Sequence, residues 1–173
     1  MIKKRICMFF IVVCCFILQT TVLKAFELGA VAPNLLLIIT AAFGFVGGRK
    51  DGMFIGVFCG LFADIFYGQL FGYYTLLYTL IGYANGFFRK IFYDDDIKLP
   101  LILIATSDFL YGNIVCIFMF IMRSRFNYFY YLKSIIFPEL IYTILVTLVF
   151  YQLILQINKK LESEEQRSAS KFV

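Results

Sequence analysis

The sequence predicts an all-α integral membrane protein, a bundle of six transmembrane helices. Three observations support this: 62% of the 173 residues are hydrophobic, only 16% are charged, and the apolar residues fall into six long stretches. A soluble domain is about 45–50% apolar and ~25% charged. A soluble fold of this length could not bury the excess apolar surface. The composition therefore excludes the ordinary soluble enzyme and predicts activity within the bilayer or at its faces.

Five of the six apolar stretches have the length of a membrane span, and the third falls just short of it. A spanning helix needs about 20 apolar residues, with ~17–25 tolerated. The stretches cover residues 6–23, 30–46, 52–67, 70–88, 99–122 and 134–155. The third, 52–67, is the shortest. We expect one transmembrane domain over 1–155, followed by a polar cytoplasmic tail, 156–173. The first stretch follows a basic start but has no small-x-small cleavage site after it, which favours an uncleaved span over a signal peptide.

The basic residues favour six spans with both termini in the cytoplasm. That topology places 12 of the 16 Lys and Arg residues inside and four outside. Merging 52–67 with 70–88 divides them 8 to 8 instead, against the positive-inside rule. The inside set is Lys3, Lys4, Arg5, Arg49, Lys50, Arg89, Lys90, Lys98, Lys159, Lys160, Arg167 and Lys171, and the outside set is Lys24, Arg123, Arg125 and Lys133.

Residue types that carry common chemistry are missing. The chain has no His, and its five Cys lie in apolar runs without a CxxC pair. No GxSxG, HExxH or Walker sequence is present. We therefore expect no catalytic residues, no cofactor and no metal site.

The clearest motif is a series of small residues with a period of four. It consists of Gly52, Gly56, Gly60, Asp64, Gly68 and Gly72. Glycines at this spacing let a neighbouring helix approach closely, which is a main route to helix packing in lipid. The glycine series therefore predicts close packing between spans, and the alternative is a docking groove for a partner helix.

Four further polar or helix-shaping positions lie in apolar surroundings. Asp108 is near the middle of its span, and Glu139 follows Pro138. Acids inside a membrane face the bundle interior and often mark ion pathways. For Asp64, Asp108 and Glu139 a proton or cation path is one interpretation, and hydrogen bonding that fixes helix order is the other. Pro33 suits the first turn of the second span, and Asn34 is expected to hydrogen-bond across helices.

These residues resemble the MreD family of rod shape-determining membrane proteins. The segment from Gly56 through Gly60 and Asp64 to Gly72 is similar to the family's G-x-x-x-D span, short loop and L-x-G opening. The run PNLLL resembles its proline-led second span, and Asp108-Phe109-x-x-Gly112 resembles its acid–aromatic–glycine patch. Pro138 falls where the family has a proline, whereas Glu139 is atypical and receives no family role.

The resemblance implies a non-enzymatic scaffold in the bacterial cytoplasmic membrane. Such a protein would support lateral peptidoglycan synthesis and cell shape with MreC, the MreB filament, the RodA glycosyltransferase and a class B penicillin-binding transpeptidase. MreD also looks similar to the substrate-binding subunits of energy-coupling-factor transporters, which gives a second hypothesis, a vitamin or metabolite transporter subunit. A proton-coupled carrier ranks third, because the two halves of the chain show no internal repeat.

Overall fold

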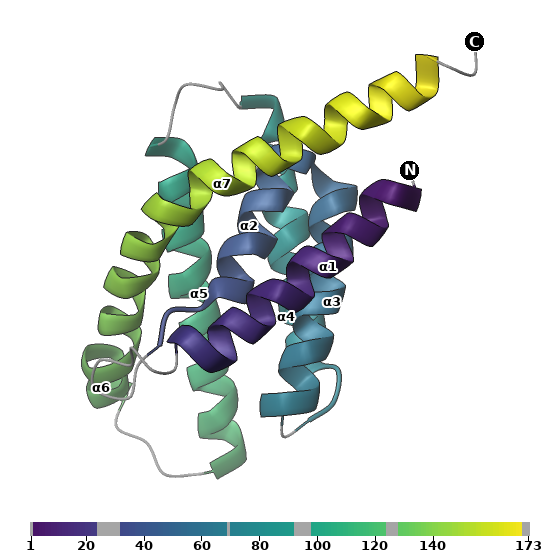
Figure 1. Ribbon diagram of the computed structural model, residues 1–173. Helices are drawn as coiled ribbons and strands as arrows, with labels where there is room; N and C mark the ends of the chain where they lie inside the picture. The colour runs from purple at the N-terminus through teal and green to yellow at the C-terminus, as the bar shows by residue number, and fades with distance from the viewer. Residues whose placement is uncertain (1, 24–31, 69, 92–97, 124–127, 171–173) are drawn as a thin grey trace.

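The structure is a computed structural model, and the described residues 2–23, 32–68, 70–91, 98–123 and 128–170 are helical with short connections and no strand (Figure 1). A π-helical turn, Gln19–Leu23, continues α1, and another, Leu132–Ile136, precedes α7. A 3-10 segment, Gly86–Ile91, follows α4. The α-helices are α1 Ile2–Leu18, α2 Leu35–Gly47, α3 Arg49–Tyr67, α4 Tyr73–Asn85, α5 Lys98–Arg123, α6 Tyr128–Tyr131 and α7 Phe137–Ser170.

Three described helices are long and apolar enough to cross a membrane: Lys4–Leu23, Lys98–Phe118 and Leu132–Ile157. They match the predicted first, fifth and last spans, and they identify an integral membrane protein. α2 and α4 have 13 residues each, about 20 Å of helix, against a hydrocarbon core of about 30 Å. α3 has 19 residues, because the helix begins at Arg49, before the apolar stretch 52–67. The count of six spans stays a prediction.

The two termini lie at the same end of the bundle (Figure 1). At this end Lys4 forms an ion pair with Asp51 over 2.7 Å, and the Arg49 guanidinium lies 3.9 Å from the centre of the Phe87 ring. α7 extends from the bundle as far as Ser170, so most of the predicted polar tail is helix.

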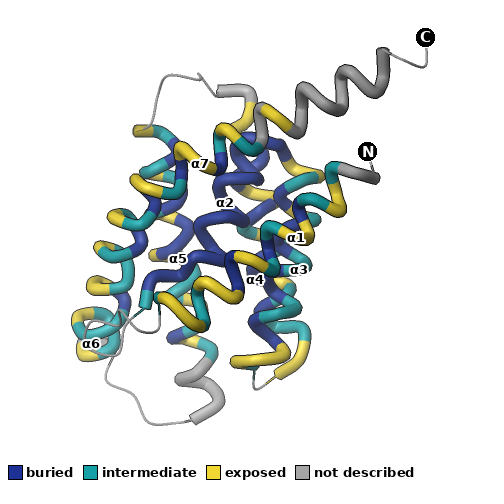
Figure 2. Tube along the Cα trace, viewed as in Figure 1, coloured by how far each residue is buried: buried dark blue, intermediate teal, exposed yellow. Residues whose placement is uncertain are grey.

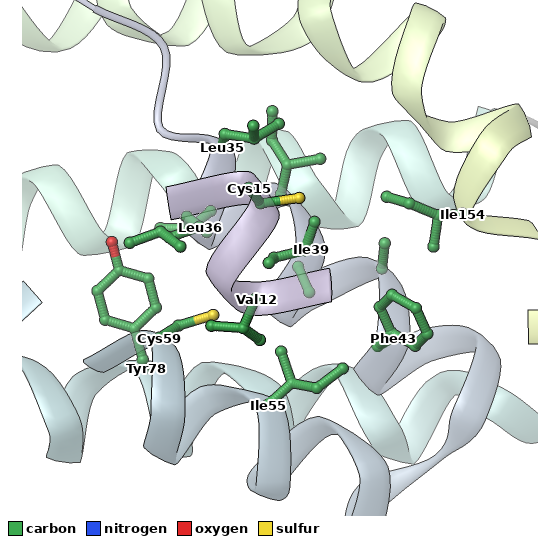
Figure 3. Close-up of a cluster of buried hydrophobic side chains, with 14 of the residues drawn as sticks. Val12, Cys15, Leu35, Leu36, Ile39, Phe43, Ile55, Cys59, Tyr78 and Ile154 are labelled. Atoms are coloured by element: carbon green, nitrogen blue, oxygen red, sulfur yellow. The ribbon is translucent and has the colours of Figure 1, made fainter. Parts of the chain in front are cut away.

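α2 is the central helix, and every one of its residues is buried (Figure 2). Its sequence LLLIITAAFGFVG is apolar around the whole circumference, which is the pattern of a helix enclosed on all sides. Figure 3 shows the core that surrounds it: Ile39 and Phe43 of α2 lie among Val12 of α1, Ile55 of α3 and Ile154 of α7. The outer helices thus share one core built on α2.

Glycines hold α3 against α4 at backbone distance. A Cβ atom placed on Gly56 would lie 2.5 Å from the carbonyl oxygen of Tyr78, and one on Gly60 would lie 2.7 Å from the backbone nitrogen of Thr75. Real Cβ atoms do not approach so closely. The close-packing interpretation therefore accounts for these glycines, and α4 of the same chain covers the face that they form.

Three helices meet where Gly44 of α2, Gly52 of α3 and Gly82 of α4 touch. A Cβ on Gly44 would lie 2.5 Å from the carbonyl oxygen of Gly82, and one on Gly52 would lie 2.6 Å from the Cα of Gly44. Because none of the three residues has a side chain, their backbones fill the centre of the contact directly.

We expect Gly56→Ala to lower the free energy of unfolding by about 1–3 kcal/mol, the usual cost of overpacking. The new methyl group would meet the backbone of α4, which cannot move aside without separating the two helices. Thermal unfolding of the purified protein in detergent measures the effect.

Gly112→Ala is the matched control for this substitution. Its Cβ would meet only the flexible side chain of Ile136, at 3.3 Å, and alanine is the better helix former. Equal melting temperatures for the two variants would contradict the proposed role of Gly56.

Candidate functional site

Asp64, near the C-terminal end of α3, caps the N-terminus of α4. Its Oδ1 accepts a hydrogen bond from the backbone N–H of Tyr74 at 2.8 Å. Its Oδ2 accepts from the N–H groups of Gly72 at 3.0 Å and Thr75 at 2.9 Å, and from the Thr75 hydroxyl at 2.5 Å. The carboxyl group is buried, with Asp64 only 3% exposed. One side chain thus joins two helices through four hydrogen bonds.

The cap supplies hydrogen-bond acceptors that the start of α4 needs inside a membrane. The first four N–H groups of a helix have no partner within the helix, and in lipid each unsatisfied group costs several kcal/mol. The N-cap residue of α4 is Gly72, which has no side chain to supply an acceptor. A carboxylate also interacts favourably with the positive end of the helix dipole. For Asp64 the geometry therefore fits the hydrogen-bonding interpretation.

Gly68 and Gly72 serve the turn between α3 and α4, which differs from the helix-packing role predicted for them. Gly68 ends α3, and its N–H donates to the Asp64 carbonyl oxygen at 3.1 Å. Gly72 has a φ of +96° and open space where a Cβ would lie. Only glycine adopts this left-handed conformation without strain. Of the six residues with period four, these two glycines therefore shape the turn that Asp64 caps.

The same turn presents exposed apolar side chains, which we name the corner surface. Phe71 is the most exposed of them, at 76%. The Phe66 ring also lies 4.7 Å from the Phe16 ring of α1, measured between centroids. The members of the corner surface are Ile65, Phe66, Tyr67, Leu70 and Phe71.

Two side chains, Asn34 and Gln19, cap the N-terminus of α2. Oδ1 of Asn34 accepts from the N–H of Leu37 at 3.1 Å and from the hydroxyl of Tyr78 on α4 at 2.9 Å. Oε1 of Gln19 accepts from the N–H of Leu36 at 3.0 Å. The expected hydrogen bond of Asn34 across helices is present. Pro33 precedes this cap residue and is not in the first helical turn, because the Asn34 side chain starts the helix one residue later.

Asp108 and Glu139 lie on the facing helices α5 and α7. Asp108 is 4% exposed, and Thr143 of α7, whose hydroxyl lies beside its carboxyl group, is fully buried. Glu139 is partly buried, one helical turn before Thr143, and interacts electrostatically with Asp108. Next to Asp108, Ser107 accepts a hydrogen bond from the Asn85 amide of α4 at 2.8 Å. Asp108 and Glu139, which are far apart in the sequence, thus lie in one seam between α5 and α7, away from Asp64.

Sequence reasoning missed several residues of these sites. Gln19, Thr75, Tyr78 and Thr143 all form polar contacts inside apolar stretches, and polarity in such surroundings was the available signal. Gly44 also carried a signal, because Gly44 and Gly48 continue the period of four upstream of Gly52, and Gly82 lies four residues before Gly86.

Among the described residues, no group of three or more His, Cys, Asp or Glu side chains is placed to hold a metal ion. Cys15 and Cys59 lie in the apolar core.

Comparisons with known proteins give one clear result. No curated protein and no solved structure matches the chain. A family model described as rod shape-determining protein MreD matches residues 2–161, which is most of the sequence. The match covers the glycine-lined α3, the Asp64 cap and the α5–α7 seam. The chain therefore belongs to the MreD family and is a rod shape-determining integral membrane protein.

Proposed function

We propose that this protein is a non-enzymatic, multi-pass scaffold of the rod complex in the bacterial cytoplasmic membrane. It supports lateral peptidoglycan synthesis by binding an MreC-like single-span partner. The binding site that we assign is the corner surface, together with the Asp64 cap that fixes its shape.

The observation that carries this proposal is an exposed apolar surface on a rigidly held turn. Asp64 fixes both ends of the turn with four hydrogen bonds. No Asp, Glu, Lys or Arg lies between Asp64 and Arg89. An apolar partner helix could therefore pack there without removing a charge from solvent, and a preformed turn loses little conformational freedom on binding.

The glycines of α3 contribute indirectly. Gly52, Gly56 and Gly60 are covered by α4, so a partner helix cannot reach them while α4 is in place. Their role in the scaffold is to hold α4 where Asp64 can cap it.

Capture of the partner tests the site. We expect the double variant Ile65→Ala with Phe71→Ala to reduce co-purification of MreC from membranes roughly tenfold, because truncated aromatic and aliphatic anchors dominate interface energies. Phe66 stays intact because it packs on Phe16. Asp64→Leu should have a similar effect, since the turn then loses its cap.

The control for this experiment is Leu145→Ala with Val149→Ala. These two side chains are about as exposed as those of Ile65 and Phe71 but belong to α7. It should capture MreC as the wild type does. If the Ile65/Phe71 and Asp64 variants insert, fold and still hold MreC at the wild-type level, the assigned docking site is wrong.

Depletion in the native cell tests the function as a whole. We expect rods to become round or wide under the microscope, because lateral wall synthesis loses its membrane scaffold. Unchanged rods combined with a nutrient auxotrophy would instead support the transporter-subunit hypothesis. Tight co-purification of one small molecule would point the same way.

A further inference from the structure

The seam between α5 and α7 holds buried oxygen atoms that lack hydrogen-bond partners. Oδ1 of Asp108 and Oγ1 of Thr143 are both inaccessible to solvent, and neither makes a hydrogen bond of good geometry with a described residue, although the two groups lie side by side. Nine-tenths or more of each residue is buried. Most buried polar side chains in proteins are satisfied, so an unsatisfied pair on facing helices requires an explanation.

The neighbouring helices supply no positive charge to this seam. Between its terminal basic residues α5 carries only Asp108, and between Lys133 and Lys159 the only charged residue is Glu139. α2 and α4 contain no Lys or Arg. None of these four helices therefore supplies a cationic side chain between its ends to balance the Asp108 and Glu139 carboxyl groups.

The side chains of the seam form an oxygen-only set of ligands. Carboxylate and hydroxyl oxygens are the ligands that hard cations prefer, and carboxyl groups inside a membrane are rare and often mark ion pathways or proton relays. The helix is also irregular here, since the π-helical turn Leu132–Ile136 comes just before Pro138 and Glu139, and π-helical turns are frequent at functional sites.

We propose that Asp108, Thr143 and Glu139 bind a small monovalent cation, with Na⁺ as the probe. One deeply buried carboxylate and one neutral hydroxyl match a single positive charge. Glu139, which is less buried, supplies a further oxygen ligand. The bound cation links α5 to α7 and satisfies the two buried oxygens. This inference is independent of the proposed scaffold function, because it concerns a different face of the bundle.

Thermal unfolding of the full-length protein in detergent tests the site. NaCl is titrated against choline chloride at constant ionic strength, since choline is too large to enter the seam. We expect the melting temperature to rise with Na⁺ and then saturate, by about 5–10 °C at a hundredfold excess over the dissociation constant.

Two variants remove the ligands with little change of shape. Asp108→Asn should melt at or above the wild-type temperature in choline chloride, because the buried charge is gone, and should lose the response to Na⁺. Thr143→Val should lose most of the response. Thr147→Val is the matched control and should keep it, because the Thr147 hydroxyl is also buried but donates to the Thr143 carbonyl oxygen at 2.6 Å.

The wild-type titration alone decides the proposal if a variant does not fold. Identical melting temperatures in NaCl and choline chloride would overturn it, as would stabilisation by MgCl₂ without stabilisation by NaCl. A sodium response that survives in both the Asp108 and the Thr143 variant would also overturn it.

Discussion

The rest of the bundle depends on the hydrogen bonds that the Asp64 carboxylate accepts from the first N–H groups of α4. They fix the turn between α3 and α4, and the position of α4 then brings its backbone onto Gly56 and Gly60. α4 in turn supplies the Tyr78 hydroxyl that binds Asn34 at the start of α2. The central helix is thus anchored through α4 to a carboxyl group on α3.

The bundle relies on such contacts because the hydrophobic effect does little between helices in lipid. Lipid tails are as apolar as leucine side chains, so helix association depends on close packing and on hydrogen bonds. Glycines allow close packing at the meeting point of α2, α3 and α4. The hydrogen bonds are made by Asp64, Asn34 and Gln19. The seam at Asp108 and Thr143 departs from this pattern, since its buried oxygens lack partners among the described residues.

The sequence predicted the long helices well and the short ones poorly. The predicted span 99–122 differs from α5, Lys98–Arg123, by one residue at each end. The agreement is close because basic residues mark both ends of this apolar stretch. The predicted span 30–46 begins too early, since α2 starts only after the Asn34 cap. The predicted span 70–88 overlaps α4, Tyr73–Asn85, and the 3-10 helix that follows it to Ile91. Caps and irregular turns end these helices inside apolar sequence, where composition does not change.

The sequence by itself determined that the protein is helical and embedded in a membrane, and that Asp64 and the α3 glycines matter, because hydropathy and a period of four are local properties. Only the tertiary structure decided what these residues contact. In the folded protein the glycine face of α3 packs against α4, and Asp64 caps the N-terminus of that helix. Asp108 lies beside Thr143, which is distant from it in the sequence. Such pairings depend on how helices pack, and one sequence does not encode packing partners in any local pattern.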